Sequence, residues 1–480
     1  MSAPFASDLI AAQHGAAVAW ITNERGARNV WVAKAPQWEA RAVTHYPDDD
    51  GQEITELSFE PGGRAVVYVR GGSGNGAGEL PNPAFIAGGV DESIWISTLG
   101  DAAPRKIAEG SGPRFSPKGG SIAFVKSGQI WIARVSPDST KPEQLTKLRG
   151  GASNLRWSPD GRYLAFTSGR QRHAFIGVWD FESKTLRYID PSTDEDGSPV
   201  WSPNGKMLAF IRTPSTVSDL IFVPERESRI PWSIRIADPA TGSSRELWRA
   251  KMGMGSVFAS IVADDQLIWS ATGDRLVFPW EADGWTHMYS IALSGGAPAP
   301  LTPGAFEVEH VSPTSDGTAI LYSSNSGDID RRHVWRVAID GSSKPNGLTT
   351  GTEGIEWSPV MASDDRTVAV LHSDARLPAR VAIVGGGLIR DLTGMPTPAD
   401  FPASRLVEPR QVILHAADGT PVHAQLFLPS GTKAGDHRPA AIFFHGGSRR
   451  QMLLGWHYMY YYSNAYAMNQ YLANRGYVVL

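Results

Sequence analysis

Short stretches of alternating apolar and polar residues recur along most of the chain, and the same turn introduces each of them. The clearest copy runs from Leu155 to Ser168, where a tryptophan is followed by Ser-Pro-Asp-Gly and then by an apolar strand that contains Ala-Phe. Proline fixes φ and removes a backbone donor, and Asp-Gly supplies the conformations of a tight hairpin turn. The copy therefore predicts a strand, a hairpin and a second, half-buried strand.

Further copies follow at regular intervals, each anchored by an aromatic or large apolar residue. The anchors are Phe59, Phe115, Trp157, Trp201, Val311 and Trp357. The first four lie about 42 to 56 residues apart, which is near the period of a four-stranded propeller blade. A second apolar strand with a tryptophan comes after the anchors, and we expect it to be the third strand of each blade. It lies at residues 94–96, 130–132, 178–179, 232–234 and 334–337.

Two more copies complete the series. The gap between Trp201 and Val311 holds a copy at residues 267–278 with His287-Met-Tyr289 behind it, and a degenerate first copy lies between Ala16 and Val32. One hairpin cannot bury its apolar face alone, so neighbouring copies must stack to form the core. The sequence thus predicts a mostly β protein with a seven- or eight-bladed β-propeller, and the count favours eight.

We place the propeller at residues 15–384. A lead-in segment at residues 1–14, with helical character at 6–12, comes before it. Residues 385–405 are rich in glycine, proline and threonine and are predicted to be a linker. The remaining residues, 406–480, form a second unit with a different pattern.

The second unit predicts a β-hairpin followed by a strand, a helix and a strand. Residues 407–414 and 422–428 alternate around a turn at Asp-Gly. A continuous apolar run at 439–444 is typical of a strand buried on both faces of a parallel sheet. A helix is expected at 459–475, and a second buried strand at 477–480. A lone strand, helix and strand cannot cover their own sheet, so these residues indicate an incomplete α/β domain.

Composition agrees with an all-β domain that has many turns. The 480 residues include 50 glycines, 34 prolines and 16 tryptophans, and there is no cysteine, which excludes disulfides, thiol catalysis and cysteine-bound metals. The net charge of −4 is made of interspersed charges, so we expect neither a nucleic-acid nor a membrane partner. No apolar run approaches the roughly 18 residues of a membrane helix. The given residues begin without signal-peptide features, and the compartment and a homo-oligomeric state stay open.

The predicted strand at 439–444 ends in a candidate catalytic loop, His445-Gly446-Gly447. In α/β-hydrolases a glycine-rich loop after an early strand offers a backbone N–H to the oxyanion of the tetrahedral intermediate. Glycine suits this task because its missing Cβ lets the backbone approach the substrate. The alternative is a plain glycine turn between strand and helix. Together with the preceding hairpin and strand, the loop favours a hydrolase domain.

At this point the chain resembles the prolyl oligopeptidase family of serine peptidases. The resemblance lies in the Trp-Ser-Pro-Asp/Asn-Gly repeats, in Trp280 to Tyr289, and in Phe443 to Gly447. Within that family it is most similar to the dipeptidyl-peptidase-IV-like and acylaminoacyl-peptidase-like branch. The resemblance implies a propeller that excludes folded proteins and a hydrolase domain that cleaves short peptides in the cavity between the two domains. No cofactor is implied.

The chain departs from that family in its catalytic residues. It contains no Gly-x-Ser-x-Gly elbow, and the Asp and His of the triad follow the nucleophile in hydrolases. Neither Ser448 nor any histidine present is therefore a triad candidate. We expect the residues given to represent an enzyme truncated within its hydrolase domain, and we expect this polypeptide alone to be inactive.

Candidate substrate-binding residues are few. Enzymes of the dipeptidyl branch resemble one another in an adjacent Glu pair that binds the substrate amine, and this sequence has no such pair. The nearest candidates are Glu225 and Glu227, for which a solvated, salt-bridged loop is the favoured alternative. Arg449 can bind a substrate carbonyl or cap its loop. Glu281 and Asp283 are expected to be turn residues.

Three further points stay open. His415 and His423 are expected on the two strands of the hairpin, where they can approach each other, but no third ligand is placed with them, so no metal site is expected. Tyrosines at 458, 460, 461, 462 and 466 either line a peptide cavity or pack in the core. The competing class is a TolB-like propeller that binds other proteins without catalysis. The α/β unit at residues 406–480 argues against a TolB-like propeller, because a propeller that only binds proteins has no need of it.

Overall fold

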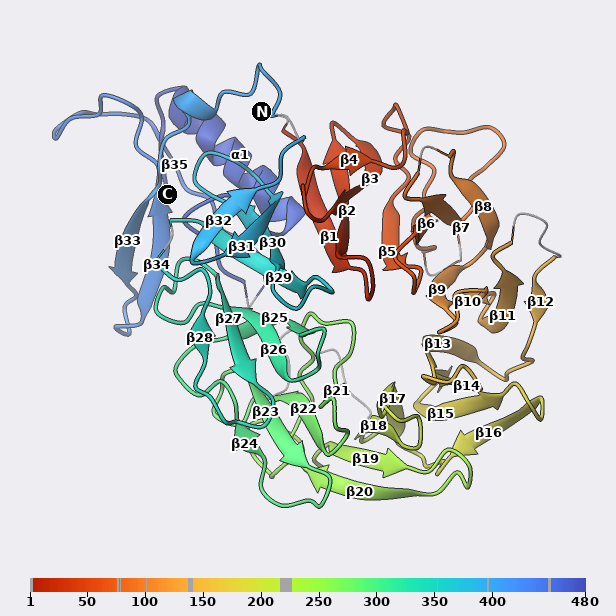
Figure 1. Cartoon of the computed structure of the whole chain (residues 1–480). Helices are drawn as coiled ribbons and strands as arrows, with labels where there is room; N and C mark the ends of the chain where they lie inside the picture. The colour runs from red at the N-terminus through yellow and green to blue at the C-terminus, as the bar shows by residue number, and fades with distance from the viewer. Residues whose placement is uncertain are drawn as a thin grey trace.

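The computed structural model describes residues 3–480 except 76, 78, 101, 137–140, 216–226, 352, 395–396 and 448–449. Within the described residues, eight successive antiparallel units of four strands surround a common centre (Figure 1). Six of these units are separate four-stranded sheets. The fourth and fifth are joined into one eight-stranded sheet through the parallel pair Ala174 and Glu195. The prediction of a propeller, with eight blades favoured, is therefore confirmed.

The first four blades occupy the N-terminal half of the chain. Blade 1 contains β1 (Phe5–Ala11), β2 (Ala17–Glu24), β3 (Ala27–Lys34) and β4 (Arg41–Ala42). Blade 2 contains β5 (Ile54–Phe59), β6 (Ala65–Arg70), β7 (Ser93–Thr98) and β8 (Arg105–Glu109). Blade 3 contains β9 (Ser111–Phe115), β10 (Ser121–Lys126), β11 (Gln129–Arg134) and β12 (Glu143–Gln144). Blade 4 contains β13 (Gly151–Trp157), β14 (Tyr163–Arg170), β15 (His173–Asp180) and β16 (Thr185–Ile189).

The other four blades complete the ring. Blade 5 contains β17 (Glu195–Trp201), β18 (Leu208–Thr213), β19 (Ser233–Ala237) and β20 (Ser244–Arg249). Blade 6 contains β21 (Ile268–Trp269), β22 (Arg275–Trp280), β23 (His287–Ala292) and β24 (Ala299–Pro300). Blade 7 contains β25 (Val308–Pro313), β26 (Ala319–Ser324), β27 (His333–Ala338) and β28 (Asn346–Gly347). Blade 8 contains β29 (Ile355–Met361), β30 (Val368–Ser373), β31 (Arg380–Gly385) and β32 (Leu388–Asp391).

The repeated Ser-Pro-Asp-Gly segment forms the turn between the first and second strands of a blade. In blade 4 the Ser158 hydroxyl donates to Asp160 at 2.6 Å and accepts from the Tyr163 N–H at 2.8 Å. Gly161 takes a φ of +75°, a conformation that favours glycine. The second strand then carries a fully buried aromatic ring in each of blades 2 to 7. These rings are Tyr68, Phe124, Phe166, Phe210, Phe278 and Tyr322, all fully buried.

The anchor tryptophans link neighbouring blades. Trp157 donates its indole N–H to the Arg114 carbonyl of blade 3 at 3.0 Å, and Trp201 does the same to the Arg156 carbonyl of blade 4 at 2.9 Å. Trp269 of blade 6 reaches the Val200 carbonyl of blade 5 at 3.3 Å. The repeat therefore encodes contacts between blades as well as the hairpin within each blade.

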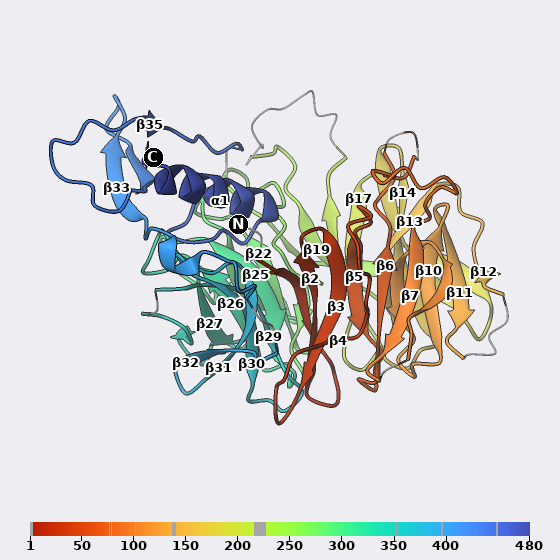
Figure 2. The same ribbon diagram turned by 90° about the horizontal axis from the view of Figure 1, so that it is seen from above.

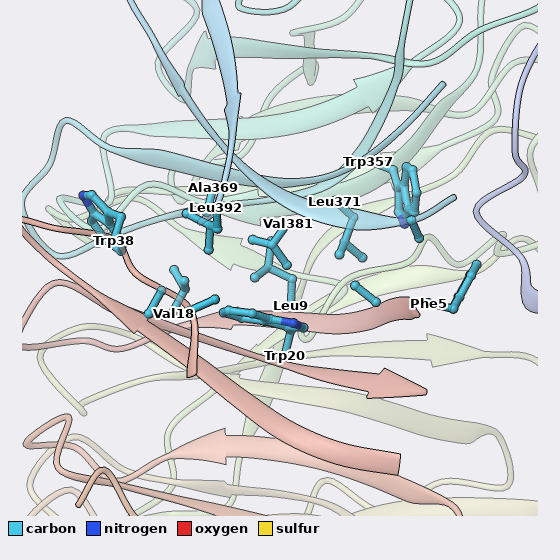
Figure 3. Close-up of a cluster of buried hydrophobic side chains, with 14 of the residues drawn as sticks. Phe5, Leu9, Val18, Trp20, Trp38, Trp357, Ala369, Leu371, Val381 and Leu392 are labelled. Carbon is cyan, nitrogen blue, oxygen red and sulfur yellow. The ribbon is translucent and has the colours of Figure 1, made fainter. Parts of the chain in front are cut away.

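The ring closes where blade 1 meets blade 8, and this corrects the prediction of a lead-in segment. Residues 5–11 form strand β1, not a helix, because Phe5 and Leu9 are buried against side chains of blade 8 such as Trp357 and Leu371 (Figure 3). The Ala6 N–H also donates to the Ala379 carbonyl at 3.1 Å. Tertiary packing outweighs the weak local helix propensity of this segment. At the other end, β32 extends the propeller into the predicted linker.

Residues 403–480 form a separate unit on one face of the ring, beside blades 7 and 8 (Figure 2). A short 3-10 helix at Ala403–Arg405 comes before the hairpin of β33 (Arg410–His415) and β34 (Pro421–Leu426). Strand β35 (Ala440–Ala441) pairs in parallel with β36 (Val478–Val479), and helix α1 (Tyr460–Asn474) connects them. A backbone hydrogen bond extends this pairing, since the Phe443 N–H donates to the Leu480 carbonyl at 2.8 Å.

This second unit has its own small core, and Phe427 joins its two sheets by an antiparallel bridge to Val479. Its buried residues are Leu406, Phe427, Trp456, Tyr466, Ala473 and Val479. The apolar run at 439–444 thus lies outside the ring as part of a second sheet, as predicted. The prediction that it is a strand buried on both faces is wrong: only Ala440–Ala441 form a strand, and Ile442 and Phe444 are 61% and 85% exposed, because within the described residues this sheet has only the two strands β35 and β36 to cover it. No helix in the described part of the chain is long and apolar enough to cross a membrane.

Candidate functional site

The loop His445-Gly446-Gly447 follows β35 on the exposed edge of the second unit. The buried Tyr462 of α1 donates its hydroxyl to the Gly446 carbonyl at 2.7 Å, and its ring faces His445 edge-on. In a trans peptide the carbonyl of one residue and the N–H of the next point in opposite directions. The Gly447 N–H therefore points away from α1.

Gly447 also needs to be glycine at this position. Its φ is +81°, which other residues rarely adopt, and an added Cβ would lie 2.9 Å from Cγ of Arg450. The loop is thus held by one hydrogen bond from α1 and by a glycine-specific turn. Such a loop can present one backbone N–H to a developing negative charge.

The predicted substrate-binding residues are only partly described. Glu225 and Arg449 lie outside the described residues, as does Ser448. Glu227 is exposed, and within the described residues no hydrogen bond or ion pair connects it to the loop at 445–447. Of these candidates the structure therefore describes only Glu227, and it does not connect Glu227 to the loop.

The remaining acidic and histidine candidates have structural contacts. Asp283 accepts from the Trp285 N–H at 3.2 Å, as expected of a turn residue, whereas Glu281 is buried. His423 lies against Asp330 of the propeller, while His415 is exposed. In the described part of the chain, no three His, Cys, Asp or Glu side chains are grouped so as to hold a metal ion.

The aromatic segment divides between core and surface. Tyr462 and Tyr466 are buried, whereas Tyr460 and Tyr461 are 50% and 70% exposed. Tyr458 instead packs against the propeller, with ring centroids 5.4 Å from His310 and 6.0 Å from Trp357. Most of these tyrosines thus pack the second unit or its boundary with the propeller.

Residues 450–459 attach the second unit to blades 7 and 8. Ser373 donates its hydroxyl to the Trp456 carbonyl at 2.6 Å, and the Trp456 N–H donates to the Asp374 carbonyl at 3.0 Å. Gly455 lies so close to blade 8 that an added Cβ would be 2.9 Å from Cδ1 of Ile355. Leu453 is part of the core that closes the ring.

A propeller carboxylate, Asp330, is the centre of this attachment. It lies in the loop between β26 and β27 and is 3% exposed. Gln411 of β33 donates to it, and Gln451 donates to its other oxygen at 3.3 Å. His423 of β34 lies 3.3 Å from the same carboxylate. Sequence reasoning missed this residue, although the charged run at 328–332 within an otherwise regular blade was a possible signal.

A buried ion pair lies next to this attachment. Arg332 donates to Glu309 at 2.8 Å and to the Gln451 side chain at 3.3 Å. Burial, together with the charge of Glu309, raises the pKa of Tyr458. A charged pair away from water is costly to break, because the remaining partner is left unpaired.

Two buried histidines at this boundary have lowered pKa values. Burial lowers the pKa of His310 and of His457 to about 4 in each case. The His457 ring accepts from the Met459 N–H through Nδ1 at 2.9 Å, so Nε2 carries the proton and donates to the Gln451 carbonyl at 2.9 Å. His457 therefore fixes the turn that leads into α1.

Comparison with known proteins matches parts of the chain to peptidases and to a Tol-Pal system protein. Residues 256–379 match the dipeptidyl peptidase IV (DPP IV) N-terminal region. The chain is 30% identical over 107 residues to the uncharacterized peptidase YuxL of Bacillus subtilis, which covers 20% of this chain and 16% of that protein. It is 28% identical over 144 residues to the Tol-Pal system protein TolB of Nitratidesulfovibrio vulgaris, which covers 28% of this chain and 32% of TolB. Both matches thus span well under two thirds of the relative.

Among solved structures, dipeptidyl peptidase 4 of Porphyromonas gingivalis has a TM-score of 0.65 at 14% identity, covering 98% of this chain and 70% of that one. At that identity the likeness concerns the fold. Together with the match of the N-terminal region, it confirms the resemblance to the DPP IV-like branch of the prolyl oligopeptidase family.

Proposed function

We propose that this chain, with its DPP IV-like propeller, supplies the propeller and the first hydrolase strands of a serine peptidase that cleaves short peptides between the two units. The observation that carries the proposal is the parallel pair β35 and β36, which lies outside the ring and ends in a glycine loop held by Tyr462. A ring of blades alone gives no reason for such a pair.

In this proposal the Gly447 N–H donates to the oxyanion of the tetrahedral intermediate. The hydrogen bond from Tyr462 to Gly446 orients the peptide that carries this N–H. Loss of one such donor typically costs about 10²- to 10³-fold in kcat. Arg449, next to this loop in sequence, is the candidate for binding a substrate carbonyl.

The residues given contain no Gly-x-Ser-x-Gly sequence. A serine peptidase needs a nucleophile with its base, and removal of both leaves only the residual effect of the oxyanion loop and of binding. We therefore propose that the polypeptide 1–480 by itself does not hydrolyse peptides.

Two experiments test this function. The coding sequence beyond Leu480 should encode Gly-x-Ser-x-Gly within about a hundred residues, followed by Asp and His. The product of the whole gene should hydrolyse aminoacyl-proline or acylaminoacyl chromogenic substrates and should be labelled by a fluorophosphonate. A gene product without that motif and without labelling would refute the proposal.

A protein-binding propeller is the second candidate, and the match to TolB over 144 residues favours it. That function would not depend on the loop at 445–447. Capture of a partner protein that survives removal of residues 406–480, with no peptidase activity in the whole gene product, would support this alternative.

A further inference from the structure

A long connection between blades 5 and 6 reaches across the centre of the ring. It joins β20 to β21, and we call its residues 258–266 the strap. Most of the strap is at least partly exposed, and Val262 is 62% exposed. Despite this exposure, the strap has defined contacts at both of its ends.

On one side the strap lies along blade 7. Val262 forms a parallel bridge with His310 of β25, and the Val311 N–H donates to the Val262 carbonyl at 3.0 Å. The Gln266 side-chain amide accepts from the Ile261 N–H and donates to the Ile261 carbonyl, each at 3.0 Å. These bonds give the strap a fixed backbone path.

On the other side the strap meets blades 3 and 4. Arg114 of β9 forms an ion pair with Asp264 at 3.0 Å, and Arg156 of β13 forms one with Asp265 at 2.7 Å. Arg156 also donates to the Asp264 backbone carbonyl at 2.6 Å. In a ring of eight blades, blades 3 and 7 lie opposite each other (Figure 1). The strap therefore spans the centre.

The root of the strap is anchored in the aromatic core between blades 5 and 6. The Gly255 carbonyl accepts indole N–H groups from Trp232 at 3.1 Å and from Trp280 at 3.0 Å. Phe258 packs on Trp232, with ring centroids 4.9 Å apart. The connection is thus held by hydrogen bonds or ion pairs at Gly255, at Val262 and at Asp264, and it is an ordered part of the fold.

We infer that the strap closes the centre of the ring to peptides, and that Arg114 and Arg156 are its latch. This inference rests on the proposed function: peptides then reach the hydrolase face from the side and not through the propeller. Asp264 is exposed, so its two ion pairs are screened by water, but a network of four charges and a backbone hydrogen bond holds more firmly than an isolated surface pair.

The first test is chemical crosslinking of the polypeptide 1–480. Because the chain has no cysteine, the only thiols in an Arg114→Cys/Asp264→Cys variant are the two introduced ones. A short bismaleimide should join them. The matched control is Lys118→Cys/Asp264→Cys, whose first site is exposed in the β9–β10 turn of the same blade and should not react within the molecule. Absence of the first crosslink would overturn the inference.

The second test concerns the latch. In Arg156→Ala, amide hydrogen exchange of residues 258–266 should rise by about tenfold or more, since the far end of the strap loses its partner. The control Arg134→Ala removes an exposed arginine of β11 and should leave the exchange unchanged. Equal exchange in both variants would overturn the role of the latch.

The third test uses the active gene product. With the strap crosslinked to blade 3, turnover of an aminoacyl-proline substrate should stay within about twofold of that of the same variant left without crosslinker. A tenfold loss would show that substrate passes through the centre and would overturn the inference. If the gene product has no peptidase activity at all, the proposed function fails. Crosslinking and amide hydrogen exchange then still test whether the strap is fixed across the centre of the ring.

Discussion

His423 of the second unit and Asp330 of the propeller lie 3.3 Å apart, between Nδ1 and Oδ2, although 93 residues separate them in sequence. Gln411 and Gln451 donate to the same carboxylate. One nearly buried propeller side chain thus connects both strands of the hairpin, through Gln411 and His423, with the segment that leads into α1. It fixes how the second unit sits on the ring.

Asp330→Ala should therefore loosen the second unit more than the propeller. Loss of a hydrogen-bonded charged partner typically costs about 1.5 to 3 kcal/mol, and three polar side chains would lose their acceptor. Limited proteolysis should cut within residues 406–480 sooner, with the propeller left intact. Asp48→Ala, at an exposed position, is the control and should digest like the parent protein.

The blade core offers a matched pair of phenylalanines. Phe210 is fully buried in blade 5, whereas Phe85 is 89% exposed. Phe210→Ala should lower the free energy of unfolding by about 3 to 5 kcal/mol, because it leaves a cavity in a packed core. Phe85→Ala should change it by less than about 0.5 kcal/mol. Similar urea midpoints for the two variants would contradict the assignment of the repeat to the core.

The contribution of the indole hydrogen bonds between blades to the free energy of unfolding can be measured with two tryptophans. Trp201→Phe removes the N–H that binds the Arg156 carbonyl and should cost about 0.5 to 1.5 kcal/mol beyond the loss of packing. Trp131 has a buried indole N–H without a partner in the described structure. Trp131→Phe should therefore cost less than Trp201→Phe in thermal or urea unfolding, and the reverse order would refute this role of the repeat.

Because His310 and His457 are buried, we expect mild acid to destabilise the folded protein. Their folded pKa of about 4 lies below the ordinary value of about 6.5, so the unfolded chain binds protons first. The stability they contribute is complete above pH 6.5 and falls as the pH drops from 6.5 toward 4. In His457→Gln the loss of stability over this range should be smaller. His14→Gln, at an exposed position, should keep the parental slope.

The repeat could be predicted from sequence because its information is local. Around Ser158 and Gly161 the turn chemistry depends on residues a few positions apart, so hairpins, blade number and core aromatics follow from pattern alone. The strand, helix and strand at the C-terminal end were predictable for the same reason. Phe5 to Ala11 was not, because its strand forms only by packing on the last blade.

The contacts between distant parts were beyond sequence reasoning. Nothing local indicates that Asp330 faces Gln411, or that Asp264 meets Arg114 across 150 residues. Both depend on how the ring closes. The loop at 445–447 was predicted from its glycines, but the hydrogen bond from Tyr462 to Gly446 required the position of α1.

The most direct test of the proposed peptidase function compares two proteins in one peptidase assay, the polypeptide 1–480 and the product of the whole gene. We predict that the whole gene product hydrolyses an aminoacyl-proline or acylaminoacyl chromogenic substrate in a fluorophosphonate-sensitive reaction, while 1–480 gives no turnover. Turnover by 1–480, or no turnover by either protein on any of these substrates, would contradict it.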